Sequence, residues 1–168
     1  MEILIPGLIL VALMVYASTK IKKSAAAAYA EEKIDAPDFS ITKPEGFISP
    51  VENSGFAFAA YSKDFGTDEA SEVRQVSADV KIFDNESLDG VRSAISNQAS
   101  KVGTEQRLAG GGFVVETEEI VNGIVVECEH RVYERDGMIY ALALKVLPEF
   151  KADQQKNIDT LIASFDVK

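Results

Sequence analysis

The stretch 113–147 decides the fold, and it reads FVVETEEIV-NG-IVVECEHRVYER-DG-MIYALALKVL. Two dipeptides, Asn122-Gly123 and Asp136-Gly137, divide it into three segments, and such dipeptides are the strongest short signals of β-hairpin turns. The last segment, 138–147, is apolar on nearly both faces, which is typical of a central strand covered on both sides. The stretch therefore predicts an antiparallel meander, with strands at 113–121, 124–133 and 138–147.

The segments on either side of the meander complete an α+β domain. Alternating or aromatic-rich runs favour strands, and we expect them at 39–42, 46–48, 56–61 and 73–83. Apolar residues at spacings of three, four and seven predict a helix over 87–102, which Asn85 or Ser87 caps and Gly103 ends. A second apolar stripe predicts a helix over 151–164. The expected fold class is α+β, a mainly antiparallel sheet with helices packed on it.

The N-terminal segment has a different character. Residues 3–19 carry no charge and, as a helix, span about 25 Å, at the short end for a bilayer core of about 30 Å. A cleavable signal peptide and a buried core helix are alternatives, but signal peptides carry positive charge before the apolar run. We expect a permanent single transmembrane helix at 1–19. Its membrane-embedded residues are Ile3, Leu4, Ile5, Leu8, Ile9, Leu10, Val11, Leu13, Met14, Val15 and Tyr16.

Three lysines, Lys20, Lys22 and Lys23, follow this segment and set its expected orientation. Lysines next to a span stay on the cytoplasmic side. We therefore expect a single-pass protein of the cell (inner) membrane, N-terminus out, with the soluble domain in the cytoplasm. Residues 20–35, rich in Ala, Lys and Glu, predict a helical connector, either a solvated stalk or a small-residue face against a partner helix. The soluble domain then spans 36–168.

Composition excludes several classes of function. The chain has 168 residues, 17 Lys and Arg against 27 Asp and Glu, and a formal net charge of −10. Nucleic-acid binding depends on Lys and Arg that meet phosphates, so the acid excess argues against it. A single Cys and a single His exclude an internal disulfide, a CxxC motif and an HExxH motif. We expect no cofactor and no metal.

Cys128 and His130 are the main candidates for chemistry, because residues two apart share one face of a strand. They could form a thiol–imidazole pair or begin a metal site. Side chains at this spacing lie about 6–7 Å apart in a regular strand, too far for a direct hydrogen bond. We favour packing of both residues in the core, where a free Cys behaves as a small hydrophobe.

Acidic residues surround the first hairpin. Cross-strand pairing could gather them into a divalent-cation site or a docking patch for a basic partner. The alternative is a solvated strand face that Arg131 and Arg135 balance. We expect a turn at Gly110–Gly112, because these glycines open a strand and not a phosphate-binding helix. The acids are Glu116, Glu118, Glu119, Glu127, Glu129 and Glu134.

Three local patterns resemble the PsbP-like (DcrB-like) group. They are Pro44-Glu-Gly-Phe47, Gly137 with Tyr140, and Ser164-Phe165. That group includes extrinsic photosystem II subunits, the bacterial envelope protein DcrB and a eukaryotic Ran-binding factor. The resemblance covers 36–168, implies a sheet with helices on both faces, and implies a non-enzymatic binding or assembly role. It carries over no functional residue, and the inward-facing anchor departs from relatives that are exported or lumenal.

Together these features predict a membrane-anchored, non-catalytic accessory or assembly subunit, or a binding module of a membrane protein complex. Its expected partners are membrane lipid, through the N-terminal helix, and a protein. One alternative is an enzyme or metal-binding domain that uses the Cys128/His130 face or the acidic cluster. Another is an exported domain released by cleavage of the N-terminal segment.

Overall fold

The computed structural model describes residues 14, 20, 26–50 and 55–168. Met14 and Lys20 are helical and exposed, while the other residues expected to form the anchor, together with Lys22 and Lys23, lie outside the described residues. Within the described part, no helix combines the length and apolar character that a bilayer crossing requires.

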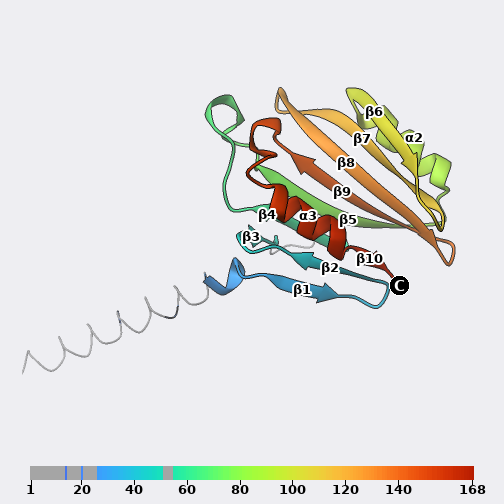
Figure 1. The fold of residues 1–168 in the computed structure, drawn as a ribbon, viewed down its shortest axis with the longest axis horizontal. Helices are drawn as coiled ribbons and strands as arrows, with labels where there is room; N and C mark the ends of the chain where they lie inside the picture. Colours follow the sequence, from blue (N-terminus) through green and yellow to red (C-terminus); the bar gives the residue numbers. More distant parts are fainter. Residues whose placement is uncertain (1–13, 15–19, 21–25, 51–54) are drawn as a thin grey trace, which may run out of the picture.

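The centre of the molecule is a seven-stranded antiparallel sheet (Figure 1). Strand β9 lies in the middle of its order, β3-β4-β5-β9-β8-β7-β6, which confirms the prediction of a central strand for the segment that is apolar on both faces. The strands are β3 (Phe47–Ile48), β4 (Phe58–Ser62), β5 (Val76–Asp84), β6 (Lys101–Arg107), β7 (Gly112–Val121), β8 (Ile124–Arg135) and β9 (Met138–Val146).

Both predicted hairpin turns are present and fix the register of the meander. Asn122 and Asp136 have φ of 52° and 51°, and the glycine after each also has positive φ. Two consecutive residues with positive φ match the twist of the flanking strands, which is why Asn-Gly and Asp-Gly are favoured there. The first turn pairs Val121 with Ile124, and this register continues to the pair of Gly112 with Tyr133.

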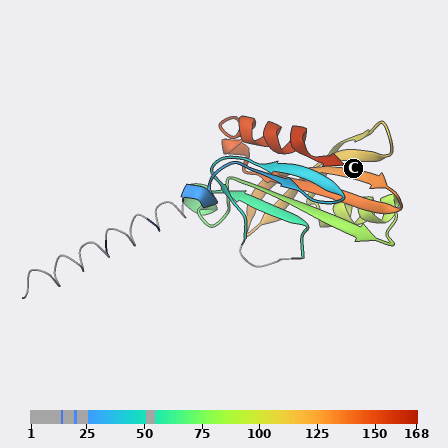
Figure 2. The same ribbon diagram turned by 90° about the horizontal axis from the view of Figure 1, so that it is seen from below.

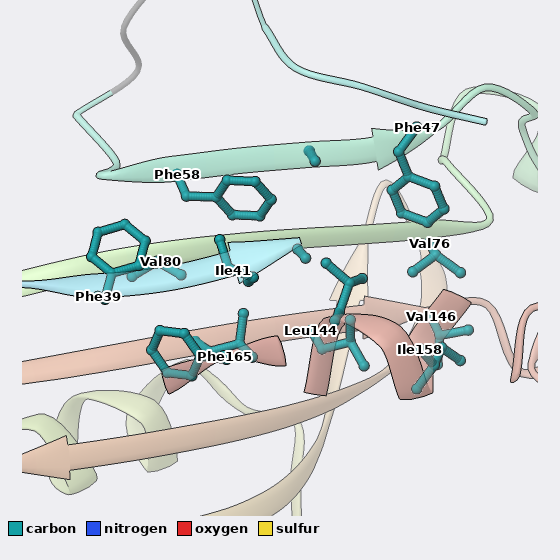
Figure 3. Packing of buried hydrophobic residues seen from close by; sticks show 14 of the residues in the cluster. Phe39, Ile41, Phe47, Phe58, Val76, Val80, Leu144, Val146, Ile158 and Phe165 are labelled. Atoms are coloured by element: carbon teal, nitrogen blue, oxygen red, sulfur yellow. The ribbon is translucent and has the colours of Figure 1, made fainter. Parts of the chain in front are cut away.

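One face of the large sheet is covered by helix α3 (Gln155–Ser164) and a three-stranded sheet. The small sheet has the order β1-β2-β10, with β1 (Glu32–Asp35), β2 (Phe39–Lys43) and β10 (Asp166–Val167). The Ser164 hydroxyl accepts a hydrogen bond from the Thr42 backbone N–H at 2.8 Å, which joins α3 to β2. The main core lies between these layers (Figure 3) and includes Phe39, Ile41, Phe47, Phe58, Val76, Val80, Leu144, Val146, Ile158, Leu161 and Phe165.

The opposite face carries helix α2 (Leu88–Gln98) and the 3₁₀ turns η1 (Asp68–Ala70) and η2 (Pro148–Phe150). The Ser87 hydroxyl caps α2 by accepting from the Gly90 N–H at 3.1 Å. Two small apolar clusters form here: Val91 packs with Phe113, Val115, Val132, Ile139 and Ala141, and Ala70 packs with Val126, Cys128 and Leu147. Helices therefore lie on both faces (Figure 2), as the PsbP-like resemblance implies.

The predicted end of the first helix is wrong. Helix α2 ends at Gln98, and residues 101–107, including Gly103, form strand β6. Every residue of β6 is exposed, so neither face of the strand requires apolar side chains. Its sequence, KVGTEQR, therefore lacks the alternation of apolar and polar residues that would reveal a strand. The terminal helix is also shorter than predicted, because residues 151–154 form turns before α3 begins.

The predicted helical connector is wrong for residues 32–35, which form strand β1. The helix before it ends at Ala28. The buried Lys43 ammonium donates to the Ala28 carbonyl at 2.8 Å and lies 3.4 Å from a Glu32 carboxylate oxygen. β1 pairs with β2 over four residues, so tertiary pairing overrides the high helix propensity of this segment.

Candidate functional site

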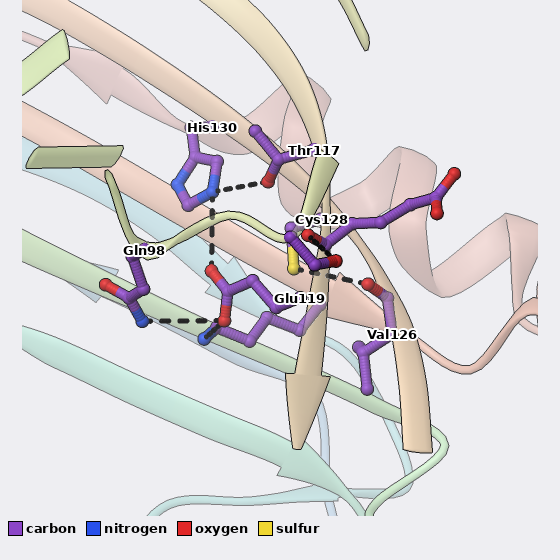
Figure 4. Close-up of polar contacts among 9 residues, drawn as sticks. Gln98, Thr117, Glu119, Val126, Cys128 and His130 are labelled. Carbon is purple, nitrogen blue, oxygen red and sulfur yellow. Dashed lines mark hydrogen bonds and ion pairs between the residues drawn. The ribbon is translucent and has the colours of Figure 1, made fainter. Parts of the chain in front are cut away.

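A buried polar cluster lies on the α2 face of the sheet, between the two small apolar clusters. Cys128 and His130 are 3% and 7% exposed, so both are buried as the favoured interpretation predicted. Glu119 reaches the same place from β7 and is 5% exposed. A carboxylate oxygen of Glu119, Sγ of Cys128 and a ring nitrogen of His130 all lie within 4.8 Å of one another (Figure 4).

Hydrogen bonds and ion pairs link the Glu119 carboxylate and Nε2 of His130 to neighbouring side chains. Lys145 Nζ lies 2.5 Å from Glu119 Oε2, and the Gln98 amide reaches the same oxygen at 3.5 Å. His130 Nε2 lies 3.2 Å from the Thr117 hydroxyl and 3.8 Å from Glu119 Oε1. The cluster thus joins β7, β8, β9 and the end of α2 through polar contacts.

The protonation states of the cluster follow from burial. Burial lowers the pKa of His130, against the opposing charge of Glu119, so the imidazole is neutral at pH 7. Burial raises the pKa of Cys128 to about 12, so the thiol keeps its proton at pH 7. Burial also raises the pKa of Asp79, on β5, to about 6, although Lys145 acts in the opposite direction.

The geometry does not support a nucleophilic Cys–His pair. The Cys128 thiol donates to the Val126 carbonyl at 3.7 Å, and His130 Nε2 pairs with Thr117 and Glu119. A nucleophilic thiol needs access and a depressed pKa, whereas Cys128 is buried and its pKa is raised. In chemical terms the cluster offers ligands for a cation, namely a thiol, an imidazole and a carboxylate.

Sequence reasoning found two members of this cluster and missed those on neighbouring strands. Thr117 lies directly opposite Cys128 on β7, and Lys145 lies directly opposite it on β9. The register that the two-residue turns impose could have located both, because counting outward from each turn gives these pairs. Glu119 sits two residues along from Thr117 on the same face.

The predicted acidic cluster forms on the opposite face and lines a groove of about 360 Å³. Glu116 lies directly opposite Glu129, and Glu118 directly opposite Glu127. Glu119 points to the other face of the sheet. The remaining side chains of the groove include Lys101, Thr104, Lys151 and three apolar residues, Leu144, Val146 and Ile158.

Each groove carboxylate has a partner within the chain. Lys101 contacts Glu118 at 2.5 Å, Lys151 contacts Glu127 at 2.6 Å, and Arg131 contacts Glu129 at 2.6 Å, so the predicted balancing by Arg131 is confirmed. The Thr104 hydroxyl donates to Glu116 at 2.5 Å. Lys101 and Lys151 donate hydrogen bonds to Glu118 and Glu127, and these bonds raise the pKa values of the two lysines. The groove thus holds four carboxylates against two ammonium groups.

The predicted turn at the three glycines is confirmed. Gly110 and Gly111 lie between β6 and β7, and the Leu108 N–H donates to the Gly112 carbonyl at 3.1 Å. At Gly112 φ is 123°, and a Cβ would lie 2.1 Å from the Val132 carbonyl oxygen. Glycine is therefore required there by close strand approach and positive φ.

Comparisons with known proteins identify the fold. No family model matches the chain, and no curated protein matches it. The solution structure of cyanobacterial PsbP (CyanoP) from Synechocystis superposes with a TM-score of 0.55 at 14% identity, covering 83% of this chain and 94% of that one. The Saccharomyces cerevisiae Ran-binding protein Mog1p superposes with a TM-score of 0.53 at 13% identity. This match covers 83% of this chain and 96% of Mog1p.

A third solved structure, LpqN of Mycobacterium tuberculosis, gives a TM-score of 0.53 at 10% identity, covering 83% of this chain and 91% of that one. LpqN is involved in cell envelope biogenesis. The chain therefore has the PsbP/Mog1-like α+β fold, which confirms that part of the sequence-based prediction.

Proposed function

We propose that this chain is a membrane-anchored, non-catalytic accessory or assembly subunit that binds a protein partner through the acidic groove. The observation that carries the proposal is the pairing of four carboxylates with an apolar wall in one cavity. Leu144, Val146 and Ile158 offer apolar contact, and the glutamates offer complementarity to basic side chains. The groove fits a segment that carries Lys or Arg beside an apolar residue.

The arrangement of the glutamates allows basic side chains of a bound protein to replace their lysine partners. Like charges directly opposite in a sheet are destabilising, and two such pairs adjoin here. Lys101 and Lys151 relieve this repulsion, but both are more than half exposed. Ion pairs between exposed side chains contribute little to stability, so basic groups of a partner can replace them at little cost.

The proposed membrane anchoring and orientation rest on the N-terminal segment. Residues 1–19 anchor the chain in the cell (inner) membrane, and Lys20, Lys22 and Lys23 keep the domain on the cytoplasmic side. Tethering raises the effective concentration of the domain near a partner in the same membrane. From Ile34 onward the chain has 24 acidic and 13 basic residues, and this excess repels anionic lipid and leaves the groove open to protein.

The shared fold supports a binding role. One structure with this fold is a Ran-binding protein, so the architecture is compatible with recognition of another protein. Together with the buried Cys128 and its raised pKa, this favours a binding module over the alternative of an enzyme at the Cys128/His130 face.

Co-purification from mild detergent tests the groove. The full chain should recover a protein partner, and adding salt should weaken the association because charges mediate it. Combined Glu118→Lys and Glu127→Lys substitutions should abolish recovery. The control, Glu69→Lys with Glu72→Lys, changes the charge equally at exposed sites outside the groove and should retain it. Recovery of the wild-type chain alone at monomer size would contradict the proposal.

A reporter fused after Lys168 tests the membrane topology. A reporter that is active only in the cytoplasm should be active in this fusion. The protein recovered from the membrane fraction should have the mass of the full-length chain. A reporter active only outside the cytoplasm would overturn the orientation. A shortened mature chain would favour the exported alternative.

A further inference from the structure

We infer that Glu119, Cys128 and His130 form a binding site for a divalent transition metal ion of the zinc class. The three residues place a carboxylate oxygen, a thiol sulfur and a ring nitrogen within 4.8 Å of one another, and all three are buried. Thiolate, imidazole and carboxylate are the ligands that zinc takes in proteins, and three protein ligands leave a fourth position for water.

The distances suit an ion that draws the ligands together slightly. Zinc bonds of about 2.0–2.3 Å in a tetrahedral site set neighbouring ligand atoms roughly 3.3–3.7 Å apart. Glu119 Oε1 and His130 Nε2 already lie 3.8 Å apart. The three residues stand on the adjacent, continuously paired strands β7 and β8, so their backbones are held in fixed register and small side-chain rotations complete the site (Figure 4).

The surroundings limit the access of water to the site. The apolar clusters around Val91 and Ala70 flank the three ligands on the same face. An apolar shell limits water access and strengthens the interaction of ligands with a cation.

Lys145 occupies the cation's place beside Glu119 in the metal-free protein. Its ammonium lies 2.5 Å from Oε2 and gives the buried carboxylate a positive partner. The Lys145 side chain is 25% exposed, so it can swing toward solvent when an ion enters. The Thr117 hydroxyl, now on His130 Nε2, can turn to release that nitrogen. Lys145 and the metal therefore compete, which makes the site exchangeable.

Titration of the purified full chain with Co²⁺ under reducing conditions tests the site. We expect one equivalent to bind, with a thiolate-to-cobalt charge-transfer band and the visible bands of a tetrahedral site, both removed by Zn²⁺. Cys128→Ser should abolish the charge-transfer band and weaken binding about tenfold or more. Lys145→Gln, which removes the competing charge but keeps a donor for Glu119, should tighten binding about tenfold or more.

Lys151→Gln is the matched control for the charge change. Lys151 pairs with Glu127 at 2.6 Å on the opposite face, so its substitution should leave Co²⁺ affinity unchanged. Glu119→Gln provides a second ligand variant should Cys128→Ser fail to fold, and circular dichroism reports the fold of each. Absence of stoichiometric Co²⁺ binding in both wild type and Lys145→Gln would overturn the inference, as would an unaltered spectrum in a folded ligand variant. None of these outcomes depends on the partner proposed for the groove.

Discussion

The two faces of the seven-stranded sheet are built from the same strands but differ in kind. The face under α3 and the small sheet holds one continuous apolar core. The face under α2 holds two small apolar clusters with the polar cluster of Glu119, Cys128 and His130 between them. Alternation along β7, β8 and β9 sends neighbouring residues to opposite faces.

The difference follows from what covers each face. On the α3 face, a helix and a second sheet cover the main core, and the acidic groove lies beside this core on the same face. On the other face, the 11-residue helix α2 and short 3₁₀ turns cover the strands in patches. Polar side chains fill the space between these patches by satisfying one another. The main core and the buried polar cluster therefore lie on opposite faces of a single sheet.

The largest expected effect comes from opening a cavity in the main core. Leu161 is fully buried in α3, so Leu161→Ala should lower the free energy of unfolding by about 3–4 kcal/mol. Ile95→Ala on the half-buried face of α2 should cost no more than about half of that. Urea denaturation of both variants measures the difference. Equal losses of unfolding free energy would show that the two faces contribute alike to stability.

Substitution of Asp79 should stabilise the protein to an extent that depends on pH. Its pKa is raised from 3.8 to about 6 by burial, so its carboxyl destabilises the fold increasingly as pH rises between these values. Asp79→Asn should therefore stabilise the protein by at most roughly 3 kcal/mol above pH 6. The gain should fall to nothing below pH 3.8. Thermal unfolding across this range checks the prediction, and a gain independent of pH would contradict it.

Two lysine–glutamate pairs allow a direct test of how burial affects ion pairs. Lys145→Ala leaves the buried Glu119 without its cation, which should cost about 2 kcal/mol once the partial exposure of Lys145 is considered. Lys151→Ala removes the partner of the exposed Glu127 and should cost less than about 1 kcal/mol. Urea denaturation of both variants, in chelator and at one ionic strength, measures the two stability losses. A larger loss for Lys151→Ala than for Lys145→Ala would contradict the greater importance of the buried pair.

The smallest effect concerns the start of α2. Ser87→Ala removes the cap of the Gly90 N–H and should cost about 1 kcal/mol. Ser93→Ala is the control, because that exposed hydroxyl bonds a carbonyl within the helix. Equal stability of the Ser87 variant and wild type would contradict a stabilising role of this cap.

Local signals in the sequence predicted much of the fold. The turns at Asn122-Gly123 and Asp136-Gly137, the alternation of β5 and the Ser87 cap are encoded within a few residues, and all appear as expected. Strands β1 and β6 were missed, because partners distant in sequence define them. The acid- and lysine-rich β1 depends on β2, and the fully exposed β6 depends on β7.

The candidate site was partly predictable for the same reason. Cys128 and His130 share a strand, so their common face was visible in the sequence. Glu119 and Lys145 join them from two other strands, and recognition of that group requires the register of both hairpins at once. The acidic cluster was expected, but the separation of Glu119 from the groove follows only from the parity of each residue along β7.

The small sheet also has a mechanical consequence. β1 and β10 run in the same direction on either side of β2, and the Lys168 ammonium lies 2.8 Å from an Asp35 carboxylate oxygen. A pull applied between Glu32 and Lys168 acts along these strands in opposite directions. It loads their hydrogen bonds together in shear, whereas a perpendicular pull would break them one at a time. Tension that arrives through the N-terminal segment is therefore borne by β1, β2 and Lys43 before it reaches the sheet that carries the groove and the polar cluster.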